Sequence, residues 1–248
     1  MNKLKVLNRN QLKYIAMILM LCDHIGAAFC EQGTTAWYIL RYVCGRTSFP
    51  IFCVLFVEGI YFTKRPLVHL RDCFIFALLS EIPFDMAFSG KSFDFANQNV
   101  MWTWFLGLFM CLMLREILKY GEDSKNKKNA DFSENVCLLA CFVICILFCI
   151  LAYLCRVDYT SVGICIIFFF FMVGYRTKFN CDYIVFGIIV AVIDGICSLT
   201  FWTFPAVLIL FLYDNKKCVN TSALQKYSFY VFYPLHLFII GLFVMYVF

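Results

Sequence analysis

The residues best suited to chemistry are ionisable side chains inside otherwise apolar stretches. Asp23 and His24 stand in the middle of the run LKYIAMILMLCDHIGAAF, residues 12–29. Ionisable groups in such a run are costly in lipid and therefore mark functional positions. Imidazole titrates near neutral pH, so His24 is suited to act as a general base. Its neighbour Asp23 points about 100° away on a helix, which leaves direct pairing of the two side chains open.

Later apolar stretches carry further ionisable residues at a similar predicted depth: Arg46, Glu81, Asp85, Asp194 and His236. Glu81 and Asp85 lie four residues apart on one helix face, where two carboxylates repel each other unless a cation serves both. We expect Arg46 to be that cation. For His236 two roles are open, a second catalytic histidine or an interhelical hydrogen bond, and the structural role is favoured.

The spacing of Lys13 and His24 also bears on chemistry, because they lie eleven residues apart. At about 100° and 1.5 Å per residue, both side chains share one helix face roughly 16 Å apart along the axis. That distance is close to the reach of the pantetheine arm of coenzyme A. Lys13 could therefore hold a phosphate at the membrane surface while His24 meets the thioester. The alternative for Lys13 is an ordinary positive anchor at the cytoplasmic end of a span.

The elements that must position these residues are predicted to be membrane-spanning helices. Of the 248 residues, 63% are hydrophobic and 15% are charged, and the mean hydropathy is +0.81. These values are far from those of an average soluble domain. Hydropathy predicts an all-α, polytopic integral membrane helical bundle with about nine transmembrane helices, in a range of 8–10. The expected spans are residues 10–30, 37–62, 67–88, 98–118, 135–154, 159–175, 182–198, 200–213 and 224–247.

Lys and Arg gather in alternate loops, which is typical of the cytoplasmic side of a membrane protein. The alternation predicts a cytoplasmic N-terminus and a multi-pass location in a cell membrane. Glu58 would lie near the cytoplasmic end of its span. We expect a single transmembrane domain over residues 1–248, with a polar cytoplasmic loop at about 119–135.

The net charge of +5 is consistent with this topology and with anionic lipid on the inner leaflet. We therefore expect membrane lipid, and no nucleic acid, as a partner. Most of the 15 cysteines fall in predicted spans, where Cys acts as a small hydrophobic residue. One row recurs every four residues: Cys137, Cys141, Cys145 and Cys149. Helix packing is the favoured interpretation of this row, a soft-metal or redox site is the less favoured one, and no metal is expected.

Several segments carry a likeness to a known family. The chain contains, in order, LKYIAMILMLCDHIGA, GRTSFPIFCVLFVEGIYFTK, LLSEIPFDMAF, QNVMWTWFLGL and KYSFYVFYPLHLFII. Together these segments resemble the TraX family, membrane proteins associated with N-terminal acetylation of conjugative pilin. The resemblance covers nearly the whole chain. More distantly, Lys13 and His24 are similar to a motif of the membrane acyltransferase-three families, in which the histidine is regarded as catalytic.

The resemblance implies an acetyl-CoA-dependent acetyltransferase of the bacterial inner (cytoplasmic) membrane that acts on an amine or a hydroxyl. The acceptor would be a pilin-like peptide or an envelope glycan. His24 would be the general base, and Arg46 would either stabilise a developing oxyanion or merely neutralise the two carboxylates. The implied catalytic residues are His24, Asp23 and Arg46, the acetyl-CoA-binding residues are Lys13 and Arg46, and the substrate-binding residues are Glu81, Asp85 and His236.

Two other classes of protein are compatible with ionisable residues in a membrane bundle. A secondary transporter would also hold such residues near the midplane, but it usually shows paired repeats, and none is evident in the sequence. A non-catalytic assembly protein of a pilus or envelope system would explain the topology but not the buried ionisable layer. The acyltransferase interpretation is favoured over both.

Overall fold

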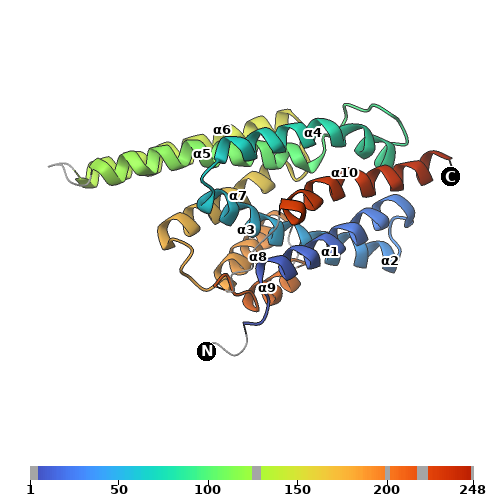
Figure 1. Ribbon diagram of the computed structural model, residues 1–248, viewed down its shortest axis with the longest axis horizontal. Coiled ribbons are helices and arrows are strands. Elements are labelled where there is room, and N and C mark those ends of the chain that lie inside the picture. Colours follow the sequence, from blue (N-terminus) through green and yellow to red (C-terminus); the bar gives the residue numbers. More distant parts are fainter. Residues whose placement is uncertain (1–4, 125–129, 199–201, 217–222, 247–248) are drawn as a thin grey trace.

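The chain is helical throughout the part that the structure describes. The computed structural model describes residues 5–124, 130–198, 202–216 and 223–246 (Figure 1). Within these ranges there are nine helical segments and only isolated β-bridges, so the all-α prediction is confirmed. The segments are α1 (Arg9–Phe29), α2 (Thr35–Tyr38) continuing through a π-helix (Ile39–Gly45) into α3 (Arg46–Phe62), α4 (Pro66–Phe88), α5 (Val100–Ser124), α6 (Ala130–Leu154), α7 (Thr160–Thr177), α8 (Ile184–Ser198), α9 (Phe204–Phe211) and α10 (Ala223–Tyr246).

Six of the described helical segments are long and apolar enough to cross a membrane: residues 9–29, 35–62, 100–123, 134–154, 160–177 and 227–246. The prediction of nine full spans is therefore only partly confirmed. Helix α4 has 23 residues but carries Arg71, Asp72, Glu81 and Asp85. Helix α8 has 15 residues and α9 has eight. At about 1.5 Å per residue, α9 is roughly 12 Å long, well short of a hydrocarbon core of about 30 Å.

The predicted polar loop at 119–135 is mostly helical. Helix α5 continues to Ser124 and α6 begins at Ala130, while residues 125–129 lie outside the described part. Glu and Lys are good helix formers, so this polar stretch can prolong two helices that already pack together. The two helices lie side by side as the long green and yellow pair of Figure 1. The ion pair Arg176–Glu134, 3.3 Å long, joins the start of α6 to the end of α7.

Helix α3 forms the centre of the bundle. It packs against α1, α5, α7, α8 and α9, and most of its side chains are buried. Helix α1 runs beside it and begins with a capping box, in which Asn8 and Gln11 exchange two 2.9 Å hydrogen bonds. Helix α10 packs along α4 and also contacts α1. The first and last helices, α1 and α10, therefore lie next to each other (Figure 1).

Glu58 of α3 bonds to residues of α1, of the segment before α8 and of the segment after α9, at the end of the bundle predicted to be cytoplasmic. It is buried and forms a 3.0 Å ion pair with Arg9. The hydroxyls of Tyr183 and Tyr213 each donate a 2.8 Å hydrogen bond to its carboxylate. These contacts satisfy the buried charge, so the position of Glu58 is explained by structure alone.

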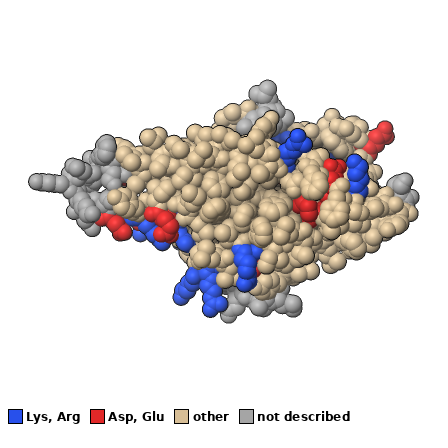
Figure 2. All heavy atoms as spheres, turned by 90° about the horizontal axis from the view of Figure 1, so that it is seen from above, with Lys and Arg blue, Asp and Glu red and all other residues tan. Residues whose placement is uncertain are grey.

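Charged side chains occupy little of the face of the molecule drawn in Figure 2. Figure 2 shows a wide uncharged area, with Lys, Arg, Asp and Glu gathered in a few groups. Large exposed apolar residues such as Leu139, Ile146 and Leu147 cover the outside of α6. A surface of this kind suits contact with lipid and supports a multi-pass membrane protein.

Candidate functional site

The centre of the candidate site is a pair of histidines from opposite ends of the chain. His24 Nδ1 on α1 lies 2.7 Å from His236 Nε2 on α10. The ring planes differ by only 6° and the ring centroids are 4.9 Å apart. The two rings are therefore nearly coplanar, and the bonded nitrogens are the atoms by which they face each other. Both residues are buried, and Phe88 and Tyr233 pack edge-on against His24. The favoured interpretation of His236, an interhelical hydrogen bond, agrees with this geometry.

The hydrogen bonds define which nitrogen of each neutral ring carries the proton. His236 Nδ1 lies 2.6 Å from the carbonyl oxygen of Phe232, which can only accept, so Nδ1 is the donor. His236 Nε2 must then accept from His24 Nδ1. This network assigns His24 Nε2 as an unprotonated nitrogen with a free lone pair. The bond to His236 keeps the proton of His24 on Nδ1, so Nε2 can accept a proton.

His24 lines a cavity of about 690 Å³. Four ionisable groups besides His24 line the same cavity within α1, the π-helix, α3 and α8: Asp23, Arg41, Arg46 and Asp194. Aromatic residues form much of the remaining wall, among them Trp37, Tyr42, Phe49 and Tyr159. A cavity with a few convergent polar groups and an aromatic wall has the features expected of a small-molecule or peptide site.

Asp23 is fixed by an arginine that the sequence analysis did not single out. Arg41 Nη1 lies 2.5 Å from Asp23 Oδ1, while Asp23 Oδ2 is 4.0 Å from His24 Nε2. The close approach depends on Gly45, since a Cβ at this position would lie 2.5 Å from Asp23 Oδ1. Asp23 is thus close enough to stabilise a positive charge on His24 without accepting a short hydrogen bond from it.

The π-helix explains why two arginines reach the same cavity. A π-helix bonds residue i to residue i+5, so Arg41 and Arg46 lie about one turn above each other. Arg46 Nη1 forms a 2.5 Å ion pair with Asp194 Oδ1 on α8, and its guanidinium lies 5.3 Å from the centre of the Tyr42 ring. π-helical turns are rare and occur frequently at functional sites.

Glu81 and Asp85 have partners other than the expected Arg46. Glu81 accepts hydrogen bonds from the Asn99 side chain and, at 3.0 Å, from Trp102 Nε1 at the start of α5. Asp85 accepts a 2.7 Å bond from the backbone N–H of Asp94. Neither carboxylate lines the cavity of His24. The two carboxylates are each satisfied by a separate local donor, so they need no shared cation. Their hydrogen bonds attach α5 and the preceding loop to α4.

Asp158 is a second residue of the cavity wall that the sequence analysis missed. It lies in the turn between α6 and α7, and its Oδ1 accepts a 2.9 Å bond from the Tyr159 N–H. Burial raises the pKa of Asp158 to about 6, although this N–H and the charge of Arg41 act in the opposite direction. The Tyr159 ring stacks on Phe49 with 3.7 Å between centroids, which fixes the turn against α3. Only the fold brings this turn to the cavity.

The raised pKa of Asp158 predicts a pH-dependent effect of Asp158→Asn on stability. Between the ordinary value of 3.8 and about 6, the folded chain holds the proton more tightly than the unfolded chain. The contribution of Asp158 to the free energy of unfolding therefore falls as pH rises through this window. We expect Asp158→Asn to raise the melting temperature of the detergent-purified protein at pH 7.5, and the gain to disappear near pH 4. An equal gain at both pH values would contradict the raised pKa.

Lys13 lines a second cavity, of about 680 Å³, rather than the cavity of His24. Its ammonium group lies 5.1 Å from the centre of the Phe229 ring, and Arg9 and His69 line the same space. Lys13 and His24 therefore line two different cavities. The contact of Phe49 with Trp104, at 5.4 Å between ring centroids, joins the wall of one cavity to the wall of the other.

The fold and the cavities together define a polytopic membrane protein with an internal ionisable site. The chain belongs to the TraX family, whose model, described as TraX protein, matches residues 8–244. The match includes both histidines of the pair and both cavities' basic residues, so the site lies inside the family domain.

One curated relative is named as a probable fimbrial assembly protein. The chain is 32% identical over 112 residues to a protein of Dichelobacter nodosus named "Probable fimbrial assembly protein FimC, serogroup H1". The alignment covers 42% of this chain and 45% of that protein, so it spans less than half of the relative's length. No solved structure matches the chain.

Proposed function

We propose that the protein is an integral membrane acetyltransferase that moves an acetyl group from cytoplasmic acetyl-CoA to an amine or hydroxyl acceptor. The observation that carries the proposal is the unprotonated Nε2 of His24, assigned from its bond to His236 in the wall of a cavity. TraX family membership supports the same reaction class. A neutral imidazole with a carboxylate nearby is an arrangement suited to general-base catalysis.

In the proposed reaction the amine nitrogen or hydroxyl oxygen of the acceptor attacks the thioester carbonyl, and His24 Nε2 takes the proton from that attacking group. A carbon–nitrogen or carbon–oxygen bond forms and the carbon–sulfur bond breaks. The leaving thiolate then takes the proton from His24, which returns to its neutral form. Asp23, 4.0 Å from Nε2, would stabilise the transient imidazolium, and Arg46 would stabilise negative charge on the carbonyl oxygen.

The cavity of Lys13 suits acetyl-CoA as the donor. Lys13 provides a cation for a phosphate, and much of the remaining wall is aromatic, with Phe52, Phe56 and Trp104. Lys13 and His24 lie on one helix roughly 16 Å apart along its axis, which is close to the reach of the pantetheine arm. For the thioester to reach His24, the arm must pass the contact between Phe49 and Trp104.

The acceptor is proposed to be the N-terminus of a pilin-like peptide, with an envelope glycan as the other candidate. The name of the Dichelobacter relative links that protein to fimbrial assembly, which favours the peptide. The same name is the one observation that favours a non-catalytic assembly protein. An assembly protein would bind pilin but would not consume acetyl-CoA, so the two proposals differ in chemistry.

The test is release of free coenzyme A by the purified protein. The protein in nanodiscs is mixed with acetyl-CoA and either a pilin N-terminal peptide or an amino sugar, and the thiol is measured. We expect release that depends on an acceptor, with a product about 42 Da heavier, the mass of an acetyl group in place of hydrogen. Absence of thiol release with every acceptor, from protein that is correctly folded, would favour the assembly role.

Lys13→Ala tests whether the second cavity binds the donor. A charge-assisted contact to phosphate exists before and during the reaction, so its loss should raise the KM for acetyl-CoA about tenfold or more and leave kcat nearly unchanged. The effect should shrink at high salt, since an exposed phosphate contact is screened. Lys119→Ala is the matched control, because Lys119 is exposed on α5 and pairs with Glu116 at 3.0 Å. An unchanged KM in Lys13→Ala would reduce Lys13 to a membrane anchor.

A further inference from the structure

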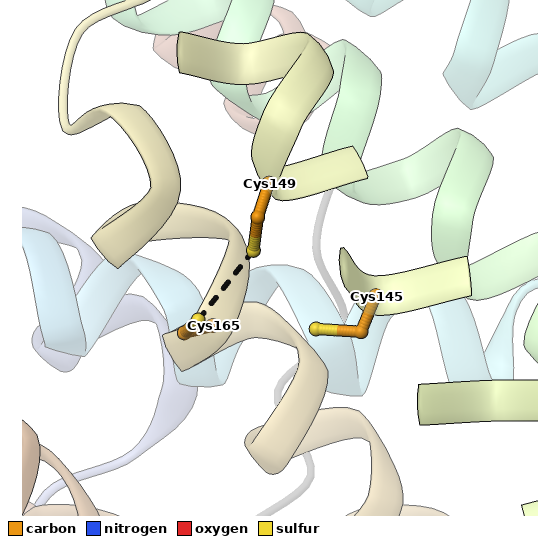
Figure 3. Close-up of side chains that lie close together, drawn as sticks. All are labelled: Cys145, Cys149 and Cys165. Atoms are coloured by element: carbon orange, nitrogen blue, oxygen red, sulfur yellow. Dashed lines mark hydrogen bonds between the residues drawn. The ribbon is translucent and has the colours of Figure 1, made fainter. Parts of the chain in front are cut away.

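Three thiols converge between α6 and α7. Cys145 and Cys149 lie four residues apart on α6, and Cys165 lies on α7. Their sulfur atoms all lie within 4.8 Å of one another, and the Sγ atoms of Cys149 and Cys165 are 3.5 Å apart. Figure 3 shows the three side chains pointing toward a common space from the two helices. This cysteine cluster lies apart from both cavities of the proposed reaction.

The row of cysteines on α6 therefore divides into two parts. Cys137 and Cys141 are buried, and Cys137 Sγ packs where a Cβ on Gly121 of α5 would lie 3.1 Å away, as small packing residues do. Cys145 and Cys149, with Cys165, instead line a groove of about 510 Å³. The groove's other walls are apolar, including Phe142, Phe168 and Phe169. Packing alone explains the first part of the row, but it does not explain why three thiols meet at a groove.

We propose that Cys145, Cys149 and Cys165 bind one thiophilic monovalent cation, Cu(I). Thiolate sulfur is a soft donor that favours Cu(I), zinc and iron–sulfur clusters over hard cations. Bonds of about 2.3 Å in a trigonal plane place sulfur atoms roughly 4.0 Å apart, which falls within the observed limit of 4.8 Å. Small rotations about the side-chain torsions suffice to close the site, since one pair already lies at 3.5 Å.

The number of donors argues for Cu(I) over zinc. Structural Zn²⁺ takes four ligands, whereas the cluster among the described residues contains three Cys and no His, Asp or Glu. Each coordinating thiol gives up its proton, because the thiolate is the form that binds a metal, and the displaced protons leave to solvent. No electron is transferred.

The experiment measures Cu(I) retained against a chromophoric Cu(I) chelator. Full-length protein in detergent is reduced, freed of reductant under anaerobic conditions and titrated with Cu(I) in the presence of bicinchoninate. We expect one Cu(I) per chain to be withheld from the chelator and to be lost in Cys149→Ser and in Cys165→Ala. The matched control Cys141→Ser removes a buried thiol from the same helix, one turn away, and should retain the ion. X-ray absorption should show a sulfur-only shell of three atoms at about 2.3 Å.

Three outcomes would overturn the assignment. The first is equal Cu(I) retention by a variant that lacks all three thiols, and the second is no retention by the folded parent. The third is a disulfide between Cys149 and Cys165 in the isolated protein, detected by alkylation and mass spectrometry before reduction. Helix content by circular dichroism, matched among parent, Ser and Ala variants, ensures that loss of the ion is not loss of the fold. Acetyl transfer does not enter this test, so its result is independent of the proposed enzyme activity.

Discussion

His24→Gln is expected to lower the turnover of acetyl transfer by about 10²- to 10⁴-fold, the usual contribution of a general base. Glutamine has a similar length and can still hydrogen bond to His236, but it cannot take a proton from the acceptor. The KM for acetyl-CoA should change little, because the proposed phosphate contacts lie in the other cavity. Single-turnover release of coenzyme A measures the effect. A variant with parental turnover would remove His24 from the mechanism.

Two variants of His236 separate positioning from general stability. A glutamine at 236 can accept from His24 Nδ1–H through its side-chain oxygen, so His236→Gln should keep part of the activity. His236→Leu offers no acceptor and should reduce turnover much more, because the proton on His24 is then no longer held on Nδ1. Combining either change with His24→Gln should add little further loss, since both residues act on one proton transfer. Equal losses for Gln and Leu would indicate a packing role for His236.

The second large effect is expected for Asp23→Ala, with a loss of about 10²-fold in turnover. The change removes the negative charge 4.0 Å from His24 Nε2 and leaves Arg41 without its ion-pair partner beside the base. Arg41 then opposes protonation of His24. Asp23→Asn keeps the shape next to Gly45 and should show most of the same loss, because the effect depends on charge.

A double-mutant cycle with Arg41→Ala tests this explanation. Removing both partners eliminates the repulsion as well as the attraction, so the double variant should be more active than Asp23→Ala alone. The cost in stability should be modest, since the Arg41 side chain is 39% exposed and can be solvated. Additive losses of turnover across the cycle would show that Asp23 and Arg41 act separately, and would contradict the electrostatic argument.

Hydropathy predicted most of the helical segments that carry the ionisable residues, but not which way those residues face. The helical segments and the layer that contains Asp23, His24 and His236 follow from runs of apolar residues, because these must leave water wherever they pack. Rotation about each helix axis depends on contacts with neighbours distant in sequence. The expected pairing of Arg46 with Glu81 and Asp85 was therefore wrong, and Asp194 is the partner instead. The bond between His24 and His236 joins residues 212 positions apart and has no local signal.

The residues missed by sequence analysis were hidden for different physical reasons. Asp158 lies in a turn outside the apolar runs, where a carboxylate is ordinarily solvated. Arg41 and Arg46 would point about 140° apart on an α-helix, so regular periodicity separates them. The polar stretch at 119–135 was mistaken for a loop because hydropathy detects contact with lipid rather than helix formation. Helical hairpins such as α5 and α6 can continue beyond the apolar layer.

The π-helix of residues 39–45 also affects how relatives should be aligned with this chain. Because each of its bonds spans one more residue than an α-helical bond, the same rise of backbone uses additional sequence. A relative with a plain α-helix here would therefore need a gap of one position, and an ungapped alignment would shift every residue before Arg46 by one. The arginine of such a relative that corresponds to Arg41, the partner of Asp23, would then be aligned with Leu40 or Tyr42. Conservation of Arg41 should be judged only after that gap has been allowed.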